Sequence, residues 1–205
     1  MTVNACIEQI RIGRPVIIFD GADREAEGDI AFAATLCTPA LVNLALTIAR
    51  GVLCVSMPED RARQLGVRRL PSNNSDKYLT PFGMPISLND GKPSVSAVGR
   101  CNTILATCNA SVQEDAFYMP GHVSTLIAHK DGLRARRGHT EGVLELLRVA
   151  GVQGNGVVCE ILNESGEIAD LAHLKRLSEK HAIPMMTIDD LQPWLSTPSV
   201  VRGMV

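Results

Sequence analysis

The sequence predicts an α+β fold, a single compact domain in which one mixed β-sheet is flanked by helices. Short runs of branched apolar residues alternate with segments whose apolar residues recur at the three- and four-residue spacing of a helix. The chain has 205 residues, 45% of them hydrophobic, which suffices to bury one sizeable core. We therefore expect residues 1–205 to form one domain with its helices packed against the sheet.

The first half of the chain predicts the order strand, helix, strand, helix. Residues 15–19 (PVIIF) are apolar and branched and stop at an Asp-Gly pair, as a buried strand does. Residues 38–50 predict a helix, because Thr38 can cap it and a proline occupies its first turn. Residues 52–57 (VLCVSM) predict a second buried strand, and residues 58–65 a short charged helix.

The second half begins with a segment that predicts loops. Residues 68–95 are rich in Pro, Asn, Ser, Asp and Gly and predict at most a short strand. Residues 123–128 predict a strand that turns through residues 130–132 into residues 133–136, which would make a hairpin. The remaining elements are a helix, a strand, a helix capped by Asp170 and a final strand, at residues 140–150, 157–162, 171–177 and 184–188.

Composition excludes several classes of protein. The formal net charge of -2 and the aromatic content of 3% argue against a nucleic-acid surface, which needs a basic face or stacking rings. The chain has no run of eighteen apolar residues and no secretory leader, so we expect a cytoplasmic protein that does not contact a membrane. The six cysteines form no Cys-x-x-Cys pair and are expected to be reduced and mostly buried. The expected partner is a small molecule.

The first candidate functional segment is acidic. Residues 20–29 (DGADREAEGD) place five carboxylates and Arg24 directly after a buried strand. Hard cations such as Mg²⁺ prefer carboxylate oxygens, and an arginine can hold an anionic group of a substrate. A solvated charged loop explains the same residues, and for an acidic cluster taken alone it is the better explanation.

The second candidate lies at the start of a predicted helix. Residues 136–141 (RRGHTE) combine arginines, a glycine and a threonine hydroxyl with the free backbone N–H groups of a helix N-terminus, which suits a phosphate. His139 could then be a metal ligand or a proton carrier. A histidine at this position is about as often a capping or packing residue, so this motif alone favours neither interpretation.

Single residues in two further places attract attention. Glu160 lies inside an apolar strand, where it either points to solvent or needs a partner of the kind that active sites supply. His122 lies in a Pro-Gly-His turn, where structural histidines are common. Cys54 and Cys159 have no nearby base in the sequence, which favours buried packing over nucleophilic catalysis.

Taken together, these segments resemble the 3,4-dihydroxy-2-butanone 4-phosphate synthase family of riboflavin biosynthesis. Several separated motifs that agree in order are more specific than any one of them, and the agreement runs across nearly the whole chain. It favours a functional role for both charged segments. The motifs are DREAEGD at residues 23–29, RGVLC at 50–54, PGHV at 120–123, RRGHTE at 136–141 and VCE at 158–160.

The resemblance implies an α+β homodimer that converts D-ribulose 5-phosphate to 3,4-dihydroxy-2-butanone 4-phosphate and formate through an enediolate. It implies Mg²⁺ or Mn²⁺ and no organic cofactor. By matching position, Glu25 and His139 would be the metal ligands. The expected catalytic residues are Asp23, Glu25, Glu27, His122 and Glu160, and the expected substrate-binding residues are Arg24, Glu25, Asp29, Arg136, Gly138, His139, Thr140 and Glu160.

The chain departs from the family pattern in its middle segment. A Thr-Thr-Gly sequence is reduced to Pro93-Ser94, Ala-Asp-Arg becomes Val98-Gly99-Arg100, and Met119 replaces an arginine. These departures leave open a diverged paralogue that acts on a related ketose or sugar phosphate in specialised metabolism. A non-catalytic sugar-phosphate-binding protein is a further alternative, which the joint retention of the acidic residues and His139 disfavours.

Overall fold

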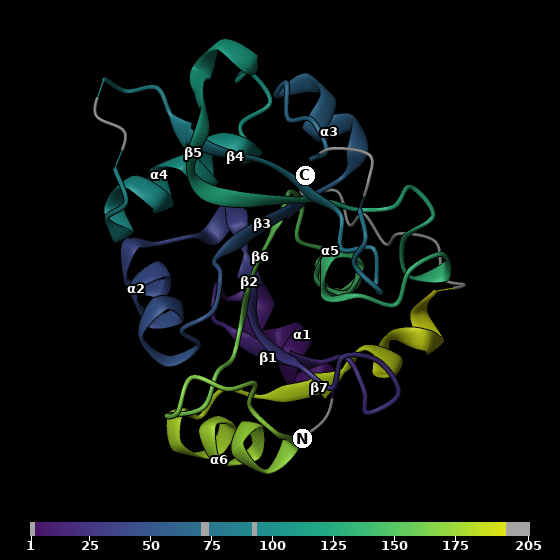
Figure 1. Cartoon of the computed structure of the whole chain (residues 1–205). Helices are drawn as coiled ribbons and strands as arrows, with labels where there is room; N and C mark the ends of the chain where they lie inside the picture. The colour runs from purple at the N-terminus through teal and green to yellow at the C-terminus, as the bar shows by residue number, and fades with distance from the viewer. Residues whose placement is uncertain (1–2, 71–73, 92–93, 196–205) are drawn as a thin grey trace, which may run out of the picture.

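A seven-stranded sheet organises the molecule, seen in a computed structural model that describes residues 3–70, 74–91 and 94–195. The strand order is β4-β5-β3-β6-β2-β1-β7 (Figure 1). The β1–β7 and β3–β5 pairs are parallel and the other pairs are antiparallel, so the predicted mixed sheet is confirmed. The strands are β1 (Val16–Phe19), β2 (Gly28–Ala33), β3 (Cys54–Met57), β4 (Phe82–Leu88), β5 (Phe117–Ile127), β6 (Gly156–Glu160) and β7 (Met185–Thr187).

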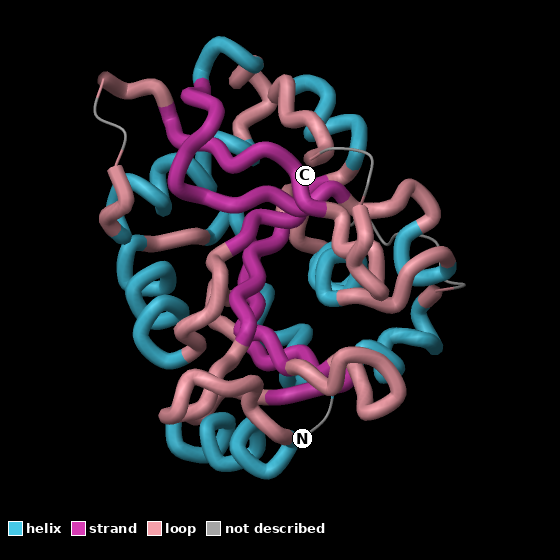
Figure 2. The backbone as a smooth tube through the Cα atoms, in the orientation of Figure 1, coloured by secondary structure: helices cyan, strands magenta, loops and turns pink. Residues whose placement is uncertain are grey.

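Helices cover both faces of this sheet, as the tube view makes plain (Figure 2). One hydrophobic core joins the sheet to α2, α4 and α6, and a second joins the opposite face to α1 and α5. The α-helices are α1 (Val3–Arg11), α2 (Pro39–Ile48), α3 (Glu59–Gln64), α4 (Ala97–Cys108), α5 (His139–Ala150) and α6 (Leu171–His181). Short 3₁₀ helices are η1 (Ala34–Leu36), η2 (Glu114–Ala116), η3 (Gly132–Arg134) and η4 (Ile188–Trp194).

Helix ends follow the capping signals in the sequence. The side chain of Thr38 accepts a hydrogen bond from the backbone N–H of Leu41 at the start of α2. Asp170 does the same for His173 at the start of α6. Gly151 ends α5 with a φ of 71°, a left-handed conformation that glycine adopts without strain. Both predicted N-caps are therefore confirmed.

Two predictions about the middle of the chain are wrong. Residues 68–95 contain β4, a seven-residue strand rather than a short one, whose pairing with β5 is interrupted by two register shifts. The predicted hairpin of residues 123–136 does not form, because β5 pairs with β3 and β4 and the segment after it folds into η3. Irregular register and a proline inside β4 hide the alternation that marks a strand.

The cysteines are as the sequence predicts. The six cysteines are free, and five of them are buried. No helix in the described part of the chain is long and apolar enough to cross a membrane. Pro93, which belongs to the segment that departs from the family pattern, lies outside the described residues.

Candidate functional site

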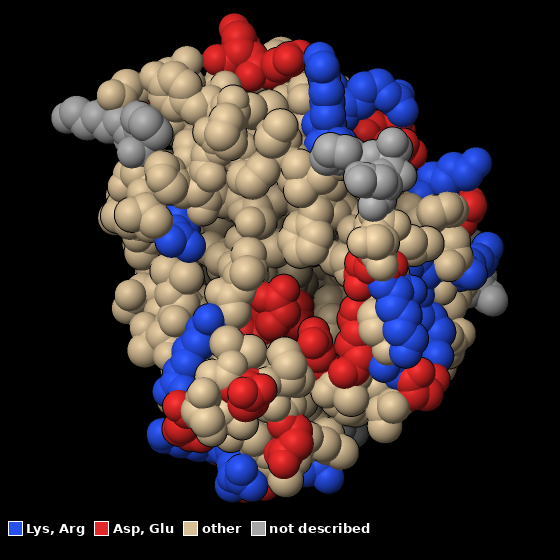
Figure 3. Space-filling view, viewed as in Figure 1, with Lys and Arg blue, Asp and Glu red and all other residues tan. Residues whose placement is uncertain are grey.

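A small cleft of about 130 Å³ gathers most of the sequence-predicted site residues. Figure 3 shows acidic side chains around a hollow near the middle of the visible face, with basic side chains beside it. Strand β2, strand β6 and the start of α5 all contribute to this cleft. Its lining consists of Arg24, Glu25, Glu27, Asp29, Thr80, Phe82, Leu126, Arg136, His139, Thr140 and Glu160.

Strand pairing explains how distant residues meet there. Phe19 at the end of β1 pairs with Gly28 at the start of β2, so residues 20–27 form the loop between two antiparallel strands. Asp29 then pairs in register with Glu160 on β6. His139 begins α5 and its Nε2 lies 3.2 Å from the carbonyl oxygen of Ile18. The acidic segment and the start of α5 are thereby fixed against the same strands.

Asp20 organises the acidic loop, a role that the sequence analysis did not assign. It is 1% exposed, and its carboxylate accepts hydrogen bonds from the backbone N–H groups of Glu25 and Glu27. It also accepts one from Arg24, at 2.6 Å. The sequence placed Asp20 in the acidic segment directly after a buried strand, but it did not distinguish Asp20 from the other carboxylates there.

Asp20, Glu25 and His139 form a group that suits a metal ion. One ligand atom from each lies within 4.8 Å of the others. Burial lowers the pKa of His139 to about 4, so its ring is neutral and has a nitrogen lone pair to offer at neutral pH. The cleft thus supplies two carboxylates and one imidazole, a donor set that hard divalent cations accept.

Three more carboxyl groups crowd the same cleft, and their pKa values are raised. For Glu27 the pKa rises to about 7, first because of burial and then because of the charges of Glu25, Glu160 and Asp20. Burial is also the main reason why the pKa of Asp29 lies well above its ordinary value. Asp29 Oδ1 is buried and has no hydrogen-bond partner in the described structure. Glu27 can therefore exchange a proton near neutral pH, and the buried carboxyl of Asp29 is stabilised either by a proton or by a nearby cation.

Glu160 faces the cleft rather than open solvent, so the outward-pointing alternative is not what the structure shows. Its Oε2 accepts a hydrogen bond of 2.7 Å from the backbone N–H of Val52. Burial raises its pKa above the ordinary value. Burial likewise raises the pKa of the neighbouring Cys159 to about 12, in keeping with a packing role for that thiol.

Two arginines form the basic side of the cleft. Arg24 pairs with Asp20 and Glu25, and its guanidinium lies 5.1 Å from the centre of the Tyr78 ring. Arg136 pairs with the buried carboxylate of Glu141 at 2.9 Å. A carboxylate partner holds each guanidinium in place while other N–H groups remain for an anion.

Three predicted residues are not among those that line the cleft. Asp23 is exposed and pairs with Arg137 at 3.0 Å. Gly138 precedes α5, where a side chain would overlap the guanidinium of Arg136. His122 is exposed on β5, and its Nδ1 lies 3.1 Å from Ser87 Oγ. The roles of these three residues remain predictions.

The structure adds residues that the sequence analysis did not select. Thr80, Phe82 and Leu126 line the cleft, and Glu141 holds Arg136 from behind it. Thr80, Phe82 and Leu126 lie outside the motifs quoted above, so no motif indicated them. Glu141 belongs to the motif at residues 136–141, but nothing in the sequence shows that its side chain is buried against Arg136.

Comparison with known proteins agrees with this picture. The family model for 3,4-dihydroxy-2-butanone 4-phosphate synthase matches residues 4–194. The riboflavin biosynthesis protein RibBA of Bacillus velezensis is 38% identical over 92% of this chain, which spans only 48% of that longer protein. A 3,4-dihydroxy-2-butanone 4-phosphate synthase of Cupriavidus pinatubonensis is 37% identical over 95% of this chain and 87% of its own length.

A solved structure shows the same fold. It is described as 3,4-dihydroxy-2-butanone 4-phosphate synthase in complex with two magnesium ions, and it superposes with a TM-score of 0.89. Its sequence is 24% identical, over 95% of this chain and 96% of that one. Since the family model spans nearly the whole chain and a relative of similar length shares more than a third of its residues, this chain belongs to the 3,4-dihydroxy-2-butanone 4-phosphate synthase family.

Proposed function

We propose that this chain is a lyase that converts D-ribulose 5-phosphate to 3,4-dihydroxy-2-butanone 4-phosphate and formate. Membership of the family supports this reaction. The observation that carries the proposal is that one cleft joins a metal-type donor set to two arginines and several proton-exchanging carboxyl groups. The reaction of a phosphorylated ketose needs a metal ion for the enediolate, arginines for the phosphate and carboxyl groups for proton transfer.

The donor set fits Mg²⁺ or Mn²⁺, and we propose that Glu25 and His139 hold the ion, together with Asp20. Carboxylate oxygens and a neutral imidazole suit both ions. Asp29 Oδ1 is buried, accepts no hydrogen bond from the described residues and lies 3.7 Å from His139 Nδ1, which also fits a site that receives a cation or a polar substrate. When bound, the ion would supply positive charge that stabilises an enediolate. No organic cofactor is needed for this chemistry.

The arginines would bind and orient the substrate. Arg136 and Arg24 are anchored by carboxylates, so each presents its remaining N–H groups in a fixed direction. Thr140 and the free N–H groups at the start of α5 lie beside them and favour a phosphate. Orientation of this kind brings the ketone end of the sugar against the carboxyl groups.

The carboxyl groups would move the protons. A carboxylate removes the proton next to the ketone, and protonated neighbours return protons as the skeleton rearranges and formate leaves. With a pKa of about 7, Glu27 is able to accept and donate near neutral pH. Glu160 and Asp29 have raised pKa values and lie on adjacent strands, so they are the other candidates for this exchange.

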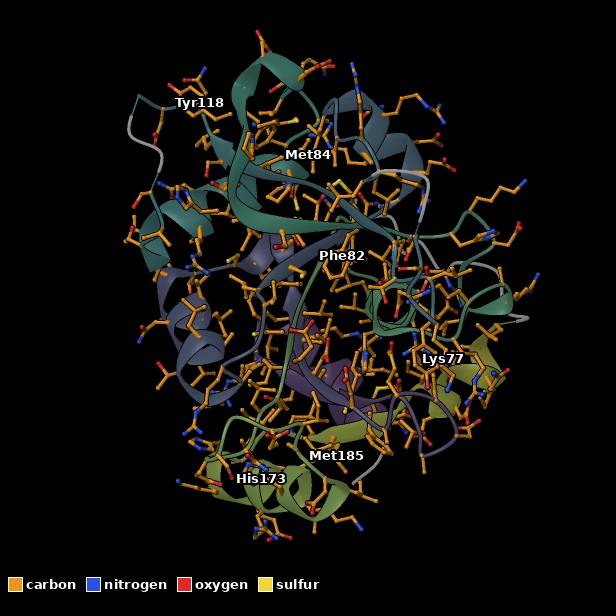
Figure 4. All side chains as sticks on the ribbon, in the orientation of Figure 1. Lys77, Phe82, Met84, Tyr118, His173 and Met185 are labelled. Carbon is orange, nitrogen blue, oxygen red and sulfur yellow. The ribbon has the colours of Figure 1, made fainter. Side chains whose placement is uncertain are left out.

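We further propose that two copies of the chain form a homodimer. Apolar side chains are exposed on β4, β5 and α4, where Figure 3 shows a broad uncharged surface and Figure 4 labels Phe82, Met84 and Tyr118. A large exposed apolar surface typically marks an interface. Phe82 also lines the cleft, so a dimer formed here would border the site.

We also propose that the protein is cytoplasmic. Six free thiols fit this compartment, which keeps cysteines reduced.

The reaction is tested by carbon and proton NMR of the purified chain with isotope-labelled D-ribulose 5-phosphate and Mg²⁺. We expect labelled formate and a four-carbon ketone phosphate in equal amounts. Conversion to a different product would contradict the proposed reaction and indicate a diverged enzyme. Binding without any turnover, with either Mg²⁺ or Mn²⁺, would reduce the protein to a sugar-phosphate binder.

A further inference from the structure

A second cleft, larger than the first, lies between α2 and α6. Its volume is about 470 Å³, within the range of pockets that bind small organic molecules. Basic groups from two separate elements line it: Arg50 follows α2, and His173, Arg176, Lys180 and His181 belong to α6. Figure 4 labels His173 on α6, and Figure 3 shows basic side chains along the same edge of the molecule.

The protein neutralises only part of the positive charge of this cleft. Arg50, Arg176 and Lys180 are permanent cations, and the single lining carboxylate, Glu164, lies 3.6 Å from His173. Within the described part of the chain, neither Arg176 nor Lys180 has a hydrogen bond or ion pair to its side chain. The cleft therefore has a net positive charge with cationic groups available to a ligand.

The favourable interaction of basic side chains with the dipole of α6 does not account for all the cations of this cleft. Cations in the last turn of α6 are favourable there, which explains Lys180 and His181. It does not explain Arg176, which lies one turn earlier, or Arg50, which comes from another part of the chain and whose guanidinium donates one hydrogen bond of 2.9 Å to the carbonyl oxygen of Asn163. Convergence of separate segments on one cavity is typical of a binding site.

The uncharged walls indicate what else the ligand contains. Ile48, Leu162 and Leu177 line the cleft beside the cations. Inorganic phosphate alone would leave this apolar surface in contact with water, whereas an organic group attached to the phosphate would cover it. Arginine forks match the oxygens of a phosphate group.

We propose that the cleft between α2 and α6 binds a phosphorylated small organic molecule, at a site separate from the cleft of Glu25 and His139. The two clefts share one segment of backbone. Arg50 lines the second cleft, and the next two residues hold Glu160, since Gly51 N–H donates to its carbonyl oxygen and Val52 N–H to its carboxylate. A ligand that binds Arg50 in the second cleft would thus be connected, through the backbone of the next two residues, to Glu160 in the first cleft.

The test is a titration of the isotopically labelled, metal-free chain with phenyl phosphate, followed by heteronuclear NMR. Site-resolved amide signals separate the two clefts even though both could take a phosphate. We expect saturable shifts at residues 173–181 and at Gly51, and a dissociation constant at least threefold lower than that for inorganic phosphate. Equal affinity for the two probes would overturn the organic part of the proposal.

Variants make the assignment specific. In the double variant Arg176→Gln, Lys180→Gln we expect affinity at this cleft to fall at least tenfold, while the shifts around Arg136 are unchanged. Lys175→Gln is the matched control, because Lys175 lies on α6 but does not line the cleft, and it should titrate like the native chain. The absence of saturable shifts on α6, or their persistence in the double variant, would overturn the proposal.

Discussion

At the residue scale, the buried carboxylate of Asp20 fixes the conformation of the acidic loop through three hydrogen bonds. Its two oxygens accept hydrogen bonds from Arg24 and from two backbone N–H groups of the loop that carries Glu25 and Glu27. Hydrogen bonds to a charged group are among the stronger ones in proteins. The loop therefore has one preferred conformation before any ligand arrives.

Asp20→Asn should weaken metal binding by at least about 10-fold, because losing a residue that only supports the ligands already costs about 10- to 100-fold and Asp20 is itself a proposed ligand. The amide keeps the shape but lacks the negative charge that faces Arg24. Isothermal titration with Mn²⁺ measures the effect. Asp60→Asn on α3, whose side chain is 85% exposed, is the control, and equal affinities in both variants would refute a role for Asp20.

Replacing Glu25 with Gln or His139 with Ala should lower kcat on the order of 100-fold or more, because each removes a proposed ligand at the reacting centre. Far-ultraviolet circular dichroism and thermal unfolding check that the fold is kept. Glu59→Gln, at an exposed position on α3, should leave kcat unchanged. Native turnover in the Glu25 or His139 variant would remove that residue from the metal site.

Sequence reasoning selected most of the cleft but not its supporting contacts. Glu25, Arg136 and His139 were selected through the resemblance of several separated motifs to one family, because each motif taken alone also had an ordinary structural explanation. The pairing of Arg136 with Glu141 depends on which way a side chain of α5 points. Only the packing of α5 against the sheet decides that.

At the scale of elements, the clearest sequence signals belong to segments with strong caps or pure apolar runs. β1, β3, α2, α5 and α6 were predicted because of such signals. β2 was not, since it begins with polar residues of the acidic loop and is buried on both faces, which removes the alternation of an ordinary strand. α4 contains Gly, Thr, Asn and Cys, which have low helix propensity, and its formation depends on tertiary packing.

Gly121→Ala should lower the thermal unfolding midpoint, because a methyl group at that position would overlap the backbone of Ile86 and Ser87 and separate β5 from β4. A loss of several degrees is expected for a disturbance of about 1–3 kcal/mol in a chain of this size. Gly142→Ala in α5 is the comparison, since its methyl group would meet only the side chain of Ile188. A larger loss in the Gly142 variant would contradict the packing described for β4 and β5.

At the scale of the whole molecule, the cleft and the exposed apolar surface adjoin, so assembly and activity are expected to be linked. Phe82 belongs to both, and His122 is exposed on β5, one of the strands that form this surface. In the proposed dimer, His122 would therefore lie close to the interface rather than inside the cleft of its own chain. The sequence alone could not show it, because an exposed apolar surface exists only once the sheet is built.

Met84→Asp should convert the proposed dimer to monomers, because a charge at the centre of an apolar interface cannot be desolvated without cost. Size-exclusion chromatography with light scattering gives the mass directly. Leu171→Asp is the matched control, as Leu171 is exposed to a similar degree but lies on α6. A native mass for the Met84 variant would place the interface elsewhere.

Glu25 and His139 are proposed to form a metal centre within a cleft that also binds the phosphorylated sugar. Electron paramagnetic resonance of Mn²⁺, titrated into the native chain and into the Glu25→Gln and His139→Ala variants, tests it most directly. We predict one bound ion per native chain, at least tenfold weaker binding in each variant, and a change in the native spectrum when D-ribulose 5-phosphate is added. Undiminished Mn²⁺ binding in both variants, or a spectrum indifferent to the sugar phosphate, would contradict the account.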